Sequence, residues 1–156
     1  MPLSMRGYTI IELLVVMAVL GILATAAMPL VELSVKRNKE RELKHAQWEI
    51  RHAIDAYKQA YDAGRIAPVS GASGYPATLR QLASGIPDMS TGGQLMYFLR
   101  RIPKDPFAGN EVPAEQSWGV RSYASTAEQP KPGADVFDVY SMSDEVGMNG
   151  LPYRQW

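Results

Sequence analysis

The spacing of hydrophobic and polar residues changes twice along the chain. The run from Leu13 to Val31 contains no charged residue. Further on, apolar residues recur every three or four positions, as on one face of a helix, and they are Leu43, Ala46, Ile50, Ala53, Ile54, Tyr57 and Tyr61. No glycine or proline interrupts Leu30 to Ala63. The pattern predicts one helix from about Tyr8 to Asp62, apolar all round at first and along one stripe later.

The rest of the chain alternates loops with short regular segments. Residues 64–76 and 85–93 are predicted loops, and Thr78–Ala83 is a predicted short helix with Thr78 as its cap. Residues 95–102 fit either a helical turn or an extended connector. Alternation in residues 117–124 and 136–141 predicts two strands.

An amphipathic helix needs a partner for its apolar stripe. We therefore predict an α+β fold in which a long N-terminal helix packs on a small antiparallel sheet. Residues 8–31 form the predicted transmembrane helix, 32–62 its amphipathic continuation and 63–156 a small globular domain.

The apolar run is long enough for a membrane, since about 20 helical residues span a ~30 Å hydrocarbon core. A cleaved secretory signal has a shorter apolar region of ~7–15 residues, followed by small residues. Ala24, Ala26 and Ala27 could supply such a site. Ordinary signal cleavage thus stays open as the alternative to a membrane anchor.

Glu12 places a carboxylate at the start of this apolar segment. A charge inside a bilayer costs at least ~2.5–3.5 kcal/mol on insertion scales, so it usually has a partner. Taken alone, Glu12 could equally lie in the headgroup region and interact with the helix dipole. Its neighbours in the sequence favour a more specific role.

The segment around Glu12 resembles the prepilin peptidase site of type IV pilins and pseudopilins. Arg6 and Gly7 end a short leader, aromatic Tyr8 begins the mature chain, and Glu12 is its fifth residue. The resemblance implies a leader of residues 1–7, cytoplasmic cleavage between Gly7 and Tyr8, and N-methylation of Tyr8. It also implies that Glu12 neutralises the α-amine of a neighbouring subunit during assembly, which pairs two otherwise isolated buried charges.

Later segments resemble the major pseudopilin of type II secretion systems and its paralogues. They are Tyr75-Pro76-x-x-Leu79-x-x-Leu82, Ile102 to Phe107 and Phe137 to Ser141. The resemblance implies a structural subunit of a secretion pseudopilus, not an enzyme, that helps to export folded proteins. Its implied partners are other copies of itself, minor pseudopilins, prepilin peptidase and the inner-membrane assembly platform.

Two alternatives accompany this interpretation. One is a subunit of a surface type IV pilus for adhesion, motility or DNA uptake. Many major pilins carry a C-terminal disulfide loop, so the absence of cysteine favours the secretion system. The other is an enzyme or binding domain on a signal anchor.

The resemblance implies a single-pass protein of the bacterial inner membrane with its C-terminal domain in the periplasm. Basic residues are more numerous after the apolar run than before it, where Arg6 is the one basic side chain. The positive-inside rule would weakly favour the reverse orientation. The predicted orientation therefore rests on the resemblance.

The resemblance also suggests a calcium ion in the C-terminal loops, where Asp144, Glu145 and Asn149 could supply side-chain oxygens. Calcium takes six to eight oxygen ligands, and this stretch is shorter and less acidic than the family pattern. A turn with solvated charges is the alternative. Calcium is thus the one suggested cofactor, and none is required.

Other candidate chemistry is sparse. Sixteen basic residues balance sixteen acidic ones, so the chain lacks a global basic field for nucleic acid. The small basic cluster of Arg100, Arg101 and Lys104 is interpreted as a solvated turn. His45 and His52 are separated by about 10 Å of helical rise, too far to chelate one metal ion.

Overall fold

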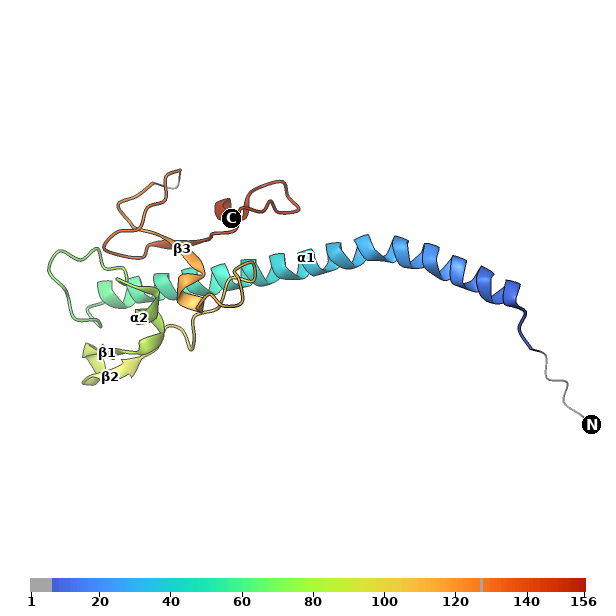
Figure 1. Cartoon of the computed structure of the whole chain (residues 1–156). Coiled ribbons are helices and arrows are strands. Elements are labelled where there is room, and N and C mark those ends of the chain that lie inside the picture. The colour runs from blue at the N-terminus through green and yellow to red at the C-terminus, as the bar shows by residue number, and fades with distance from the viewer. Residues whose placement is uncertain (1–6, 127) are drawn as a thin grey trace, which may run out of the picture. The chain divides into compact units, whose positions relative to one another are not determined.

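The computed structural model describes residues 7–126 and 128–156. Apart from Gly7, the predicted leader lies outside the described residues. The chain packs as two units, one that ends at Asn38 and one that begins at Lys39. A single helix, α1 (Ile10–Asp62), contributes residues to both units (Figure 1). The predicted long helix is therefore confirmed, starting two residues later than expected, while the proposed domain boundaries stay predictions.

The end of α1 is determined by a glycine. Gly64 has a φ of 70°, in the left-handed region that only glycine enters without strain. Its N–H donates to the carbonyl of Tyr61, and the N–H of Arg65 donates to that of Ala60, each over 2.9 Å. These two bonds make a Schellman motif, which satisfies carbonyls at the end of the helix and turns the chain away.

The core of the second unit forms on the predicted stripe of α1. Its buried helical residues are Leu43, Ala46, Ile50, Ala53, Ile54, Tyr57 and Ala60. They belong to one cluster with residues from every later part of the chain, including Leu82, Trp118, Val139 and Tyr153. The stripe is therefore covered by residues of the same chain, as the α+β prediction requires.

A short helix, α2 (Leu79–Ser84), follows the first loop and buries Leu79 and Leu82. Thr78 occupies the N-cap position, but its side chain makes no capping hydrogen bond, so its predicted role is wrong. Instead the Oε1 atom of Gln81 accepts a 2.8 Å hydrogen bond from the N–H of Ala77. The side chain of Gln81, inside the helix, thus accepts a hydrogen bond from a backbone N–H that precedes the helix.

The predicted loop at 85–93 is wrong in part, because a hairpin begins there. Strand β1 (Ile86–Asp88) pairs antiparallel with β2 (Gln94–Met96), with the 3₁₀ turn η1 (Met89–Thr91) between them. Strands of three residues show too little alternation to be recognised in a sequence. The sequence alone therefore could not predict the pairing of residues 86 and 96.

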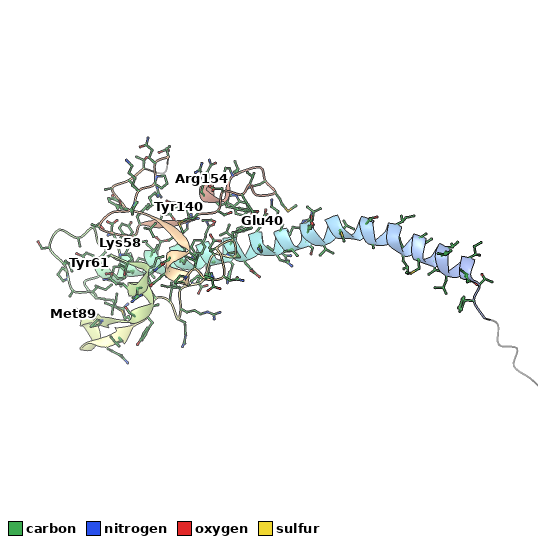
Figure 2. All side chains as sticks on the ribbon, in the orientation of Figure 1. Glu40, Lys58, Tyr61, Met89, Tyr140 and Arg154 are labelled. Carbon is green, nitrogen blue, oxygen red and sulfur yellow. The ribbon has the colours of Figure 1, made fainter. Side chains whose placement is uncertain are left out.

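The second hairpin confirms the predicted pairing of two strands. Strand β3 (Trp118–Arg121) runs antiparallel to β4 (Asp138–Ser141), with Gly119 opposite Tyr140. A Cβ atom at Gly119 would overlap the ring of Tyr140, which Figure 2 labels. The expected small sheet is thus two separate two-stranded hairpins, and glycine lets an aromatic ring cross one of them.

The remaining elements are single turns. They are the 3₁₀ turns η2 (Ala114–Gln116) and η3 (Tyr153–Gln155) and an isolated bridge between Val146 and Pro152.

Candidate functional site

The start of α1 is built by a cap that lies beside the predicted cleavage point. The Oγ1 atom of Thr9 accepts a 3.2 Å hydrogen bond from the N–H of Glu12, and the Thr9 carbonyl accepts one from Leu13. Thr9 and Glu12 have the spacing of a capping box. The sequence already contained this Thr-x-x-Glu signal, although Thr9 was not singled out.

The cap leaves the Gly7–Tyr8 peptide outside the helix. Both residues lack regular secondary structure, and Tyr8 is 81% exposed. A peptidase must bind its substrate in an extended form, which a helical peptide bond cannot adopt without unwinding. The Gly7–Tyr8 peptide bond is therefore exposed and not held in a helix, and cleavage there stays a prediction.

Glu12 lies in the first turn of α1, at the positive end of the helix dipole. None of the ion pairs found among the described residues includes it. A carboxylate there gains roughly 0.3–1 kcal/mol from the dipole at an exposed position. That gain is small beside the cost of placing the charge in a bilayer.

The first half of α1 exposes apolar side chains on every side. Four consecutive residues, Leu13, Leu14, Val15 and Val16, are between 50% and 63% exposed. Since successive helical residues point about 100° apart, four in a row cover the whole circumference. No side of this segment is covered within its unit, so lipid or other protein chains must cover it.

Within the described residues, α1 is the one helix long and apolar enough to cross a membrane. One polar side chain of this apolar segment, that of Thr25, is hydrogen-bonded within the helix. The hydroxyl of Thr25 donates a 2.8 Å hydrogen bond to the carbonyl of Ile22, one turn earlier. A polar side chain satisfied within its own helix can be tolerated in hydrocarbon.

Within the second unit, a buried carboxylate on α1 binds the C-terminal segment of the chain. Glu40, labelled in Figure 2, is 8% exposed. Its Oε1 accepts hydrogen bonds from the N–H of Met148 (2.7 Å) and the hydroxyl of Tyr153 (3.0 Å). Burial, with help from the carboxylate, raises the pKa of the Tyr153 hydroxyl well above its usual value. No sequence signal separated Glu40 from its exposed charged neighbours.

Arg51 makes a second connection between α1 and the rest of the domain. Its Nε donates to Asp138 over 2.7 Å, and its other donors reach the carbonyls of Val139 and Trp156. Arg121 shares Asp138 at 3.1 Å. One guanidinium thus joins the helix, strand β4 and the last turn.

A third polar cluster links the segment just after α1 to the first hairpin. Two nitrogens of the Arg65 guanidinium donate to Oδ2 of Asp88, and Oδ1 of Asp88 accepts from the N–H and hydroxyl of Ser90. These hydrogen bonds, that from Arg65 foremost, lower the pKa of Asp88 to about 2.

The residues suggested for calcium belong to the loop after β4. The Oδ1 of Asn149 already accepts a 3.1 Å hydrogen bond from the N–H of Leu151, and Asp144 and Glu145 are exposed. In the described part of the chain, no three acidic, histidine or cysteine side chains gather as a metal cluster. Two carboxylates and one engaged amide fall short of six to eight ligands, so calcium stays a prediction.

The two histidines and one residue of the basic cluster have contacts within the chain. His45 and His52 both stack on Trp48, with ring centroids 6.4 and 5.1 Å apart. Lys104 donates a 2.8 Å hydrogen bond to the carbonyl of Asn110. The stacking was not anticipated, although spacings of three and four on a helix would have indicated it.

Two comparisons with known proteins bear on these observations. Residues 3–28 match the family model described as the prokaryotic N-terminal methylation motif. The type II secretion system core protein G of Klebsiella michiganensis is 28% identical over 138 residues, which cover 85% of this chain and 89% of that protein. No solved structure matches the chain significantly.

The motif match covers the cap, the Gly7–Tyr8 peptide and Glu12, while the relative extends the similarity through the second unit. The two findings are independent of the contacts described above. Together they confirm that this chain resembles the type IV pilin-like family and, within it, the major pseudopilin of type II secretion systems.

Proposed function

We propose that the chain is a structural subunit of a type II secretion pseudopilus and assembles through the first half of α1. The observation that carries this proposal is the apolar surface exposed on all sides of α1 between Leu13 and Leu23. Such a surface can lie in a membrane before assembly and against other copies afterwards. In this role the subunit performs no chemistry, and its filament helps to push folded proteins out of the cell.

Glu12 would guide the assembly step. After cleavage between Gly7 and Tyr8, the new α-amine would be methylated and would meet the Glu12 carboxylate of a neighbouring subunit. Each charge alone is costly in an apolar filament core, and pairing them removes most of that cost. The absence of an ion pair to Glu12 among the described residues leaves its carboxylate for such a partner.

The proposed partners follow from this mechanism. They are other copies of the chain, minor pseudopilins, prepilin peptidase and the inner-membrane assembly platform. The similarity to a secretion core protein supports a single-pass anchor in the inner membrane with the second unit in the periplasm. No nucleic-acid partner is proposed.

The decisive test is the intact mass of the chain purified from membranes with and without prepilin peptidase. We expect loss of residues 1–7 and gain of one methyl group only when the peptidase is present. Gly7→Val should prevent cleavage, and Gly21→Val is its control, because a Cβ atom at either glycine would meet nothing within 4 Å. A full-length mass in both strains, or cleavage near Ala27, would overturn the proposal.

The pairing role of Glu12 is tested by crosslinking neighbouring subunits in membranes. Glu12→Ala leaves a neighbour's ammonium buried without a partner, at a cost of about 3–5 kcal/mol. Multimers should then fall on the order of 100-fold or more. Glu32→Ala, another exposed acidic position on α1, is the matched control and should assemble normally. Normal assembly of the Glu12 variant would remove the pairing mechanism.

Deleting the gene for this chain distinguishes a pseudopilus subunit from the alternative, a subunit of a type IV pilus. A pseudopilus subunit should be needed for export of a folded protein while surface pili persist. Loss of pili with normal export would favour the alternative.

A calcium ion at Asp144, Glu145 and Asn149 is a further proposal, suggested by the resemblance. Excess calcium should raise the melting temperature of the full chain in detergent relative to chelator, and Asp144→Asn should reduce that rise. Equal melting temperatures with calcium and with chelator would exclude it.

A further inference from the structure

The C-terminal loop contains the one asparagine of the chain that a glycine follows, Asn149. The other two asparagines, Asn38 and Asn110, are each followed by a charged residue. Asparagine before glycine is the pair most prone to deamidation, because glycine has no side chain to hinder its backbone nitrogen and its backbone is the least restricted. Asn149 and Gly150 are both exposed, so water reaches the pair.

Deamidation needs a free backbone N–H at Gly150. The nitrogen gives its proton to hydroxide and attacks the side-chain carbonyl carbon of Asn149. The bond from that carbon to the amide nitrogen breaks, ammonia leaves after taking a proton from water, and a cyclic succinimide remains. Water then opens the ring at either carbonyl, which produces aspartate or isoaspartate. The backbone of isoaspartate runs through the side chain and is longer by one carbon.

The nitrogen of Gly150 is already engaged in the folded chain. Its N–H donates a 2.9 Å hydrogen bond to the carbonyl of Gly147. Gly150 has a φ of 79°, in the left-handed region that closes this turn. The Oδ1 of Asn149 accepts from the N–H of Leu151 over 3.1 Å, which holds the carboxamide in one orientation. Attack by the nitrogen of Gly150 therefore requires that the turn open.

The turn is also held from outside. The N–H of Gly147 donates to the carbonyl of Leu151 over 2.9 Å, which joins the two ends of the turn. Glu40 on α1 accepts from the N–H of Met148, inside the turn, and from the hydroxyl of Tyr153, just after it. One buried carboxylate thus binds both the turn and the segment that follows, and opening the turn breaks these bonds.

We propose that Asn149 is a modification site controlled by the fold. It remains an amide while the turn is closed, and it converts to aspartate or isoaspartate when the turn opens. Isoaspartate lengthens the backbone between Gly147 and Leu151, which are bonded to each other, so the turn cannot close again in the same geometry. A chain that has opened is thereby marked permanently, and Glu40 determines how often this occurs. The site lies in the second unit and is independent of the assembly surface on the first half of α1.

The test incubates the full chain in detergent at mildly alkaline pH, alongside the same chain unfolded in guanidinium chloride. Protease digestion and mass spectrometry follow the exchange of amide for acid at Asn149, and chromatography separates aspartate from isoaspartate. We expect the folded chain to react at least about tenfold more slowly, because opening of the turn costs free energy. Asn110 is also exposed, and it is the internal reference that should remain an amide in both samples.

The role of Glu40 is tested by substitutions under folding conditions. Glu40→Ala removes the acceptor of two hydrogen bonds, so deamidation of Asn149 should be about tenfold faster. Glu42→Ala, at an exposed acidic position on the same helix, is the matched control and should react like the unchanged chain. Tyr153→Phe keeps the ring and removes one donor, so its increase should be smaller, on the order of threefold. This variant decides the question should circular dichroism show that Glu40→Ala does not fold.

Several outcomes would overturn the proposal. They are equal rates in the folded and unfolded chain, no reaction at Asn149 in the unfolded chain, an equal reaction at Asn110, or unchanged rates in Tyr153→Phe and a folded Glu40→Ala. The first of these would mean that the turn is open most of the time in the folded chain.

Discussion

The two parts of α1 carry apolar surface of opposite kinds. Before Asn38, Ile22 is 70% exposed and its neighbours are similar on every side; after Lys39, Ile54 is 1% exposed within a stripe. The apolar surface of the first part must be covered by lipid or by other chains, whereas that of the second part is covered by residues of the same chain. One helix can therefore serve both assembly and folding because its apolar pattern changes from all-round to one-sided.

The carboxylates on the two parts differ in the same way. Glu40 is buried and accepts two hydrogen bonds from its own chain, over sequence separations of 108 and 113 residues. Glu12 takes part in no ion pair among the described residues. A satisfied carboxylate stabilises a fold, whereas one left over in an apolar segment indicates a partner molecule.

The strongest test of this comparison truncates an isoleucine in each part of α1. Ile54→Ala should lower the free energy of unfolding of the second unit by about 2–5 kcal/mol, through lost burial and a residual cavity. Ile22→Ala should change it by less than about 0.5 kcal/mol. Chemical unfolding of the full chain in detergent, followed by the fluorescence of its three tryptophans, which all lie in the second unit, measures both. Similar losses would mean that the two surfaces are not distinct.

A second test compares the carboxylates. Glu40→Ala leaves the Tyr153 hydroxyl and the Met148 N–H without their acceptor, so it should cost about 1–3 kcal/mol of unfolding free energy. Glu12→Ala should leave that free energy unchanged while reducing assembly. A loss of stability in the Glu12 variant would show that its carboxylate serves the fold as well.

The smallest expected effect is a pH dependence confined to the second unit. Asp88 has a pKa of about 2 in the folded chain, against 3.8 normally. Because the folded value is the lower one, its ionised form stabilises the fold above about pH 4, and this contribution disappears as the pH falls toward 2. The melting temperature of Asp88→Asn should therefore depend less on pH between 4 and 2 than that of the unchanged chain. Parallel pH profiles would contradict this assignment.

Local signals explain what could be predicted. The spacing of Leu43, Ile50 and Ile54 identified both the helix and the face that is buried. The alternation around Val120 and Val139 identified the strands of the second hairpin and allowed their pairing. The short strands at Ile86 and Met96 gave no such signal, because three residues hardly define a period.

The candidate functional residues also differ in whether they are close together in the sequence. Gly7, Tyr8 and Glu12 are close in sequence, so a motif could reveal them. Glu40 and its two donors, Met148 and Tyr153, are more than a hundred positions apart, so no local motif could reveal their contact.

The sequence by itself determined the long helix, its two kinds of apolar surface, and the segment that resembles a processing site, since each depends on residues within a few turns of one another. Only the tertiary structure decided that Glu40 is buried and that Arg51 joins three elements. Burial and hydrogen bonding depend on which distant residues meet, and that is a property of the packed chain rather than of any local pattern.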